Sequence, residues 1–410
     1  MKVFPRQKIY GYSLFRQIKI FFSKKKNCEK FIKKYFELND EYYVNFVFKA
    51  RIGLFHILKY LIKNNNSKNK ILLSSFTVFD MINMVLLSGF EPIFIDHYKN
   101  SPEIDLKCLK KNIDNYGNRI GAVLLTHYNV NNSKLDDIVK ICKKNNIMLI
   151  EDCAISIGSK FKNDYVGKFG DFSIFSFGFY KFINVLSGGM IFSKNKSFYN
   201  YVINEEKTWK YAGFHNLYKS IFKNIFIRIF TSKIIFNIIF PVIRFSYENN
   251  IKLVTKYLIN DPKPHKKNDF PENYKYRLSE LQKNDIVFQL DRIEYQRKIR
   301  KKNYFRYLEN IKNKKIKFFH NENSLLNENA YLNFPIIIQT KEHFMNYMLS
   351  NGIDLSPQFY RSVNTLAFFK DYADKTNLIQ ETVTNLVFLP TYDKIENKYI
   401  DMTIDIINEY

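Results

Sequence analysis

The chain has few cysteines, and their positions exclude two kinds of site. Only four cysteines are scattered over 410 residues, and no two of them form a CxxC pair. A disulfide framework or a cysteine-based zinc site depends on closely defined spacings. We therefore interpret these residues as buried thiols in a reducing compartment, and we predict no metal site: Cys28, Cys108, Cys142 and Cys153.

Targeting and membrane-spanning segments are also missing from the sequence. The residues MKVFPRQKIYGYSLFRQ at the start lack the apolar core of a signal peptide. The charge-free run IIFNIIFPVI (234–243) is too short to cross a bilayer as a helix. The sequence predicts a cytoplasmic protein.

Acidic residues are scarce, with 39 Asp and Glu against 64 Lys and Arg, and the formal net charge is +25. Such an excess fits nucleic acid, anionic lipid or an anionic substrate as a partner. Zinc-finger spacing and the aromatic RNP motif are absent, and the lysines form no single block. This spread favours the codon bias of an AT-rich genome, and we predict no nucleic-acid partner.

Apolar residues, by contrast, are abundant, at 46% of the chain. From residue 42, short apolar runs alternate with helical stretches; the runs include KILLSSF, EPIFIDH, GAVLLTHY, NIMLIEDC, DFSIFSF and GGMIFS. Runs that are apolar throughout are typical of strands buried on both faces, in mainly parallel sheets covered by helices. Ligands of such sheets bind beyond the carboxyl ends of the strands. We predict an α/β fold with a smaller C-terminal α+β domain.

Composition divides the chain into four predicted parts. They are an N-terminal segment (1–41), a large domain (42–216), a hydrophobic and basic insert (217–260) and a small C-terminal domain (261–410).

Polar residues at the predicted strand ends suit pyridoxal phosphate. Asp152 ends the run IMLIED, Lys181 follows another strand 29 residues later, and a Gly-Gly pair (188–189) opens the next strand. A lysine amine forms a Schiff base with the cofactor aldehyde, and an aspartate keeps the pyridine nitrogen protonated. A strand-end Asp alone is more often a cap, and a lysine alone is more often a surface residue. The order and spacing of the set favour the cofactor site.

The phosphate of such a cofactor needs N–H groups, a hydroxyl and positive charge. The helix expected after Ala50 offers N–H groups at its start. Ser176 offers a hydroxyl, and Arg51 offers a fixed charge.

The stretch LIEDCAISIGSKFKNDYVGKFGDFSIFSFGFYKFINVLSGGMIF (149–192) resembles the signature region of the DegT/DnrJ/StrS family of nucleotide-sugar aminotransferases. ARIGLFHILKYLI resembles the family's phosphate-binding helix, YRLSELQKNDIVFQLDRI the start of its small domain, and NLVFLPTYDKI a C-terminal strand. The resemblance covers roughly residues 42–200 and 274–410, and the insert lies outside it.

This resemblance implies the fold of type I (aspartate-aminotransferase-like) pyridoxal phosphate enzymes, and a homodimer with active sites at the subunit interface. It implies transfer of an amino group from an amino acid, commonly glutamate, to a nucleotide-linked keto-sugar, for a surface polysaccharide such as lipopolysaccharide. Lys181 then forms the Schiff base and moves protons as a general base, and Asp152 pairs with the ring nitrogen. Ser176 and the main-chain N–H groups near Arg51 and Ile52 bind the phosphate.

Three residues depart from the family pattern. Ile155 stands where the family commonly has Gln or His, and Val78 stands where it has an aromatic residue on the cofactor ring. Lys275 replaces an Asn that reaches the partner subunit's cofactor phosphate. These departures keep two alternatives open: a non-catalytic cofactor- or nucleotide-sugar-binding protein or scaffold, and a sugar dehydratase of the same fold. Known dehydratases of this kind have histidine in place of the lysine, so the presence of Lys181 argues against a dehydratase.

The insert has isoleucine and phenylalanine on most sides of any helix drawn through it. Cations interrupt it every few residues, so spanning a bilayer is unfavourable: Lys219, Lys223, Arg228, Lys233 and Arg244. We favour a helical arm packed on the dimer partner or on its own domain. The alternative is a surface helix, which predicts weak, salt-sensitive association with anionic membranes.

Overall fold

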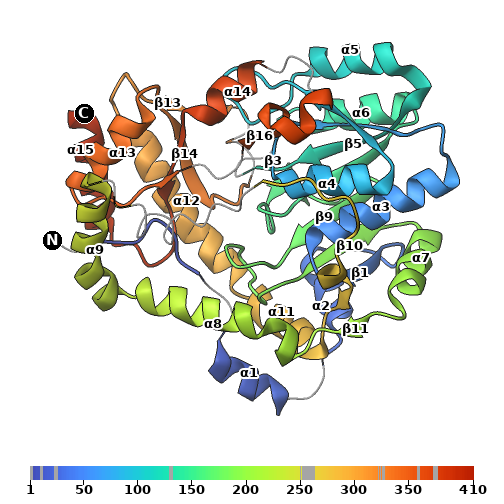
Figure 1. Ribbon diagram of the computed structural model, residues 1–410, viewed down its shortest axis with the longest axis horizontal. Coiled ribbons are helices and arrows are strands. Elements are labelled where there is room, and N and C mark those ends of the chain that lie inside the picture. Colours follow the sequence, from blue (N-terminus) through green and yellow to red (C-terminus); the bar gives the residue numbers. More distant parts are fainter. Residues whose placement is uncertain are drawn as a thin grey trace.

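The computed structural model describes residues 3–9, 13–22, 26–128, 133–249, 251, 264–321, 323, 325, 328–357, 361–372 and 377–410. Figure 1 shows a large α/β unit, a smaller unit that contains the C-terminal helix, and two helices that run between them.

A seven-stranded sheet with the order β1-β10-β9-β6-β5-β2-β4 forms the centre of the large unit. Its strands are β1 (Tyr43–Val47), β2 (Lys70–Ser74), β4 (Glu91–Ile95), β5 (Ile120–Thr126), β6 (Met148–Asp152), β9 (Phe172–Ser176) and β10 (Gly189–Ser193). Only β10 runs antiparallel to its neighbours in this sheet. Most residues of these strands are buried, because both faces of the sheet are covered. The predicted α/β sheet is confirmed.

Helices connect and cover these strands, and short elements join them. They are α2 (Cys28–Tyr35), α3 (Ala50–Asn64), α4 (Phe79–Ser88), α5 (Leu106–Tyr116), η1 (Gly117–Arg119), α6 (Leu135–Lys144) and α7 (Lys196–Glu206). The short strand pairs are β3 (Phe76–Thr77) with β16 (Arg361–Ser362), β7 (Lys160–Phe161) with β8 (Asp164–Tyr165), and β11 (Lys210–Tyr211) with β12 (Tyr276–Arg277).

The smaller unit contains the antiparallel sheet β13-β14-β17-β15. Its strands are β13 (Lys317–Phe318), β14 (Asn333–Ile337), β15 (Ser356–Pro357) and β17 (Leu386–Pro390). Its helices are α12 (Ile293–Asn310), α13 (Lys341–Ser350), α14 (Asn377–Thr384) and α15 (Asn397–Glu409), with η4 (Val363–Thr365) and η5 (Ala367–Tyr372). A separate core formed by α12, α15 and β14 also includes Phe4 from the start of the chain.

The segment before the small unit packs on the large one. α11 (Glu280–Leu290), preceded by η2 (Glu272–Tyr274), contacts α1 (Leu14–Phe21) and α2. Ile286 and Leu290 of α11 belong to the core of the large unit. The predicted domain limits at 216 and 260 stay predictions.

The described part of the predicted insert forms two helices, α8 (Phe214–Phe230) and α9 (Lys233–Glu248), which we call the arm; residues 250 and 252–260 of the insert lie outside the described residues. Leu217 and Ile221 of α8 join the large core, whereas Phe236 and Phe240 of α9 pack against Val3 and Leu349. The arm therefore bridges the two units, along the lower left of Figure 1. Within the described residues, no single helix has the length and apolarity to span a membrane; α8 and α9 meet that test only together, bent by 84°.

Candidate active site

A cavity of about 1170 Å³ lies where the large unit, the small unit and the arm meet. The carboxyl ends of the parallel strands β5, β6 and β9 contribute Thr126, Asp152 and Ser176. The small unit adds Arg300 and Thr391, and other residues come from three further segments: Lys49–Arg51 at the start of α3, Gly178–Lys181 after β9, and Asn216–Ser220 of the arm. This location is the one expected for a ligand site in a parallel sheet.

Lys181 and Asp152 face this cavity and interact electrostatically. Burial lowers the pKa of Lys181 to about 8, and the charge of Asp152 opposes this shift. Burial raises the pKa of Asp152, while the N–H of Ala154 and the charge of Lys181 oppose the rise. Asp152 Oδ1 accepts a hydrogen bond from the Ala154 N–H at 3.0 Å. That bond leaves the carboxylate acceptor capacity toward the cavity.

Two glutamines of α11 hold the loop that follows Lys181. Gln282 Nε2 donates to the carbonyl oxygens of Val185 and Ser187, at 3.0 and 2.9 Å. Gln289 exchanges two hydrogen bonds with the backbone of Asn184, at 2.9 and 3.0 Å. A side-chain amide carries both N–H donors and an acceptor oxygen, so these two glutamines fix the loop without a charged residue.

The Gly-Gly pair brings the next strand against the start of α3. A Cβ on Gly189 would lie 2.7 Å from the Ala50 nitrogen and 2.8 Å from the Phe175 oxygen. Only glycine permits this approach. Ser176 lies opposite Gly189 in the sheet register. Ser176 and the first two residues of α3, Ala50 and Arg51, thus line one part of the cavity, and a hydroxyl beside a helix N-terminus fits a phosphate.

Arg51 lines the cavity, but an acidic residue already holds its side chain. It forms an ion pair with Asp80, to which Lys267 is also paired. Tyr274 accepts a longer hydrogen bond from Arg51, at 3.3 Å. The adjacent Lys49 lies over the Tyr274 ring at 4.3 Å, and burial lowers its pKa to about 8, with Arg51 and Lys267 adding to the shift. Lys49 is therefore a second cation beside the predicted phosphate position.

The four other predicted residues divide into two pairs. Val78, the residue before α4, and Ile155, which packs with Phe76 and Tyr128, both line the cavity. Ile52 is fully buried, and its N–H donates to the Lys49 carbonyl at 3.0 Å, so it does not line the cavity. Ala50 and Arg51, the two residues before Ile52, line the cavity instead.

Lys275 does not line the cavity of its own chain either. Its side chain pairs with Glu272 at 2.5 Å. A contact with the partner subunit stays a prediction.

Glu151, next to Asp152, is buried and fixes the turn at 167–170. Its oxygens accept hydrogen bonds from the N–H groups of Gly167, Phe169 and Gly170 at 2.6–2.8 Å, and Oε2 also contacts His127 Nε2 at 2.8 Å. These bonds explain why the IED and VGKFGD motifs occur together. Three side chains that can bind metals lie with their donor atoms within 4.8 Å of one another: His127, Glu151 and Cys153. The glutamate oxygens, however, already accept the backbone hydrogen bonds of the turn.

Several cations of the cavity were not predicted by the sequence reasoning. Lys8 comes from the first segment, Lys219 and Lys223 come from the arm, and Arg300 comes from α12. Arg300 donates to the Leu332 carbonyl at 2.7 Å. In the sequence, these residues look like members of ordinary basic surface runs, and no local signal separates them from other lysines and arginines.

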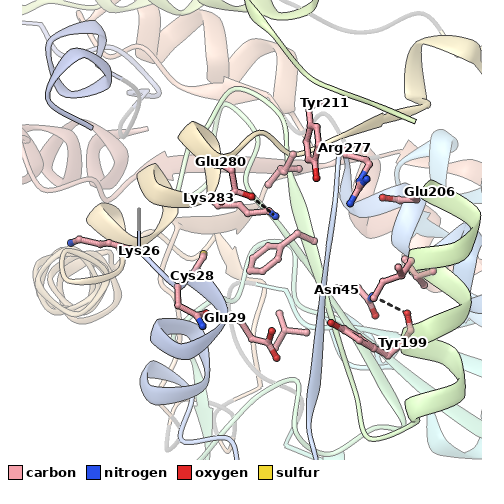
Figure 2. A pocket seen from close by; sticks show the side chains of 16 residues that line it. Lys26, Cys28, Glu29, Asn45, Tyr199, Glu206, Tyr211, Arg277, Glu280 and Lys283 are labelled. Carbon is pink, nitrogen blue, oxygen red and sulfur yellow. Dashed lines mark hydrogen bonds and ion pairs between the residues drawn. The ribbon is translucent and has the colours of Figure 1, made fainter. Parts of the chain in front are cut away.

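A smaller cavity of about 500 Å³ lies beside β1, α2 and α11 (Figure 2). Its side chains are engaged with one another: Glu280 pairs with Lys283 at 3.1 Å, and Arg277 lies over the Tyr211 ring at 4.6 Å. Asn45 donates to the Tyr199 carbonyl at 3.3 Å. This cavity contains neither Lys181 nor Asp152, so the larger cavity is the candidate active site.

The fold is that of type I pyridoxal phosphate enzymes. A solved aminotransferase of pseudaminic acid biosynthesis, PseC from Helicobacter pylori, matches all of this chain and 99% of its own, with a TM-score of 0.74 and 15% identity. GDP-4-keto-6-deoxy-D-mannose-3-dehydratase from E. coli matches 99% of this chain and 100% of its own, with a TM-score of 0.72 and 16% identity. Both likenesses concern the fold.

A family model matches residues 28–220 and 257–408, and the chain belongs to the DegT/DnrJ/EryC1/StrS aminotransferase family. GDP-perosamine synthase from Escherichia coli O157:H7 is 30% identical over 178 residues, which is 43% of this chain and 48% of that protein. A UDP-4-amino-4,6-dideoxy-N-acetyl-beta-L-altrosamine transaminase from Campylobacter jejuni is 37% identical over 130 residues, 32% of this chain and 34% of that protein. These matches therefore span about a third to a half of the relatives. Most of the arm lies outside the family match.

Proposed function

We propose that this protein is a pyridoxal phosphate-dependent aminotransferase that acts on a nucleotide-linked keto-sugar. The observation that carries the proposal is that Lys181 and Asp152, which influence each other electrostatically, line one cavity beside a phosphate-type donor set. The names of the two relatives, a perosamine synthase and an aminosugar transaminase, support this substrate class.

Pyridoxal phosphate would supply an aldehyde for amine capture and a ring that accepts electrons. Lys181 would hold the aldehyde carbon and, once displaced by an incoming amine, would carry a proton between that carbon and the amine-bearing carbon of the substrate. Asp152 would keep the ring nitrogen charged, and Ser176 with the start of α3 would hold the phosphate. The residues of this cavity fit each of these needs.

The cavity also fits a substrate with a diphosphate. Lys8, Lys219 and Lys223 line it, and burial lowers the pKa of Lys8 and Lys223. Partly buried ammonium groups favour an anionic ligand, because a ligand charge compensates their lost hydration. We further propose glutamate as the amino donor, a homodimer, a cytoplasmic reaction and a product used for surface polysaccharide.

The test is spectroscopic and chemical. Protein supplied with pyridoxal phosphate should become yellow, and it should lose that absorbance when L-glutamate is added. Addition of nucleotide-linked 4-keto-sugars should then give an amino sugar by mass spectrometry. Absorbance that no amino acid changes would contradict the proposal and favour a binding protein, whereas a deoxygenated keto product would indicate a dehydratase.

A further inference from the structure

Exposed apolar side chains are concentrated on three helices. The described residues include 23 exposed large hydrophobic side chains; 13 of them lie on α1, α8 and α9, and Phe22 directly follows α1. These helices contain only 8, 17 and 16 residues. Phe15, the second residue of α1, and Phe22, the residue after its end, are 81% and 82% exposed, and Ile234 of α9 is 77% exposed. Contiguous exposure of this kind marks an interaction surface.

The exposed residues of the arm follow one side of each helix. On α8 they recur as Phe214, Tyr218, Phe222, Phe226 and Ile229, and on α9 as Ile234, Ile238, Val242 and Phe245. Spacings of three and four residues place side chains on the same helix face. The opposite faces pack inward through Leu217, Ile221, Phe236, Phe240 and Ile243. We call the outward residues, with Phe15, Ile18 and Phe21 of α1 and the adjacent Phe22, the outer stripe.

The three helices are neighbours at one side of the molecule (Figure 1). α8 contacts α9. Burial lowers the pKa of Arg228 on α8, and the nearby Arg16 of α1 adds to the shift, so these two helices are also close. The outer stripe is therefore one surface with contributions from three segments.

The charges on these helices have almost a single sign. Their cations are Arg16, Lys19, Lys219, Lys223, Arg228, Lys233 and Arg244, against one carboxylate, Glu248. Arg16, Lys233 and Arg244 form ion pairs with Asp285, Glu396 and Glu248, and Lys219 and Lys223 line the candidate active site. Pairing two copies through this surface would place like charges close together, and the whole chain carries +25. An anionic surface complements both the charge and the apolar stripe.

We propose that the outer stripe docks this protein on an anionic lipid bilayer, with α1, α8 and α9 lying in the plane of the interface. Phenylalanine and isoleucine side chains enter the boundary between headgroups and acyl chains, and the exposed cations Lys19, Lys233 and Arg244 contact lipid phosphates. α8 also lines the candidate active site, and Tyr218 and Phe226 of the outer stripe belong to that lining, so docking places the cavity beside the membrane surface. This inference does not depend on which reaction the protein performs.

The test uses sedimentation of the full chain with vesicles of phosphatidylcholine, alone or mixed with phosphatidylglycerol. We expect binding to the anionic vesicles at low salt, weaker binding at high salt, and little binding to neutral vesicles. The double variant Phe222→Gln/Ile238→Gln should bind at least about tenfold more weakly, because it removes two inserted side chains. Phe222 and Ile238 are 64% and 69% exposed, so the fold should tolerate both changes.

Tyr295→Gln provides the matched control, because Tyr295 on α12 is 60% exposed but lies outside the outer stripe. Its binding should equal that of the wild type. Circular dichroism of each variant checks the fold. Absence of binding to anionic vesicles at low salt, or equal binding by the double variant, would overturn the proposal. A double variant that instead lowers the molecular mass in light scattering would assign the stripe to a second copy of the chain.

Discussion

Lys181 and Asp152 illustrate how one cavity gives two ionisable groups complementary properties. Burial shifts the lysine toward its neutral form and the aspartate toward its protonated form, while each charge opposes the shift of the other. A neutral amine is the form that attacks a carbonyl carbon. A buried carboxylate is well placed to bind a protonated ring nitrogen, because that cation compensates its lost hydration.

Replacing Lys181 tests its role directly. Lys181→Ala should abolish amino transfer, because Lys49, whose pKa burial also lowers to about 8, lies beside the predicted phosphate position and not where Lys181 lies. Product formation by the purified variant would be followed by mass spectrometry, with circular dichroism as the folding control. Wild-type turnover by this variant would remove Lys181 from the mechanism.

The depressed pKa of Lys181 predicts a pH dependence of cofactor capture. Below a pKa of about 8 the amine is mostly protonated, so the rate of capture should rise with pH and level off above it. An ordinary lysine would give a midpoint near 10.4. Stopped-flow absorbance after mixing with pyridoxal phosphate measures this profile.

Lys49 also has a pKa of about 8, so a control must separate the two amines. Lys49→Gln should weaken cofactor binding but keep the midpoint of the capture rate. A midpoint that disappears with Lys49 would assign the titration to that residue.

At the scale of elements, the start of α3 and the start of β10 form one unit. Their contact requires Gly189, where a Cβ would meet backbone atoms of Ala50 and Phe175 that cannot rotate away. The glycine thereby sets the position of the helix N-terminus that faces the cavity.

Gly189→Ala should therefore lower the free energy of unfolding by about 1–3 kcal/mol, because backbone must shift to admit the methyl group. Thermal and urea unfolding measure the change. Gly213→Ala is the control: an added Cβ there meets nothing within 4 Å, and the change should stay below about 1 kcal/mol. Equal losses in both variants would mean that the close approach is not the cause.

The sequence predicts most elements of the central sheet, because a strand buried on both faces must be apolar. The runs KILLS, EPIFI and GMIFS correspond to β2, β4 and β10. It also predicts that Asp152, Ser176 and Lys181 meet at one cavity, since carboxyl ends of parallel strands share an edge. The hydrogen bond from the Ile52 N–H to the Lys49 carbonyl could not be predicted, because it depends on local geometry that residue identity does not determine, and a phosphate contact of Ile52 stays a prediction.

The partners of Arg51 and the position of the arm could not be predicted. Asp80 and Lys267 reach Arg51 from segments distant in sequence, so no local pattern indicates the ion-pair network. The arm was expected to pack on its own domain or on the dimer partner, and it packs on both units of its own chain. Its lysines reach the cavity only through that packing.

At the scale of the whole molecule, the predicted dimer concerns Lys275. In one chain this residue pairs with Glu272 and lies away from the cavity lining. The family resemblance implies that it reaches the cofactor phosphate of the partner subunit. A complete site would then need residues from two chains.

Mixed dimers test this arrangement. Lys181→Ala and Lys275→Ala should each be weakly active or inactive, and mixing them after subunit exchange should restore about a quarter of wild-type activity, since each mixed dimer has one complete site. Light scattering should show a dimer for both variants. Mixtures that never exceed the mean of the separate variants would indicate that Lys275 acts within its own chain or not at all.

The salt bridge between Arg6 and Asp354 affects the order in which the two units can fold while the chain is being synthesised. The two residues are 348 positions apart, and Phe4 packs in the core of the small unit. At a translation rate of roughly 5–20 residues per second, the first segment waits about 20–70 s for its partners. The large unit can close its sheet after β10, whereas the small unit stays open until both ends of the chain are present. The newly made protein therefore passes through a state with a formed sheet and an unfinished cavity.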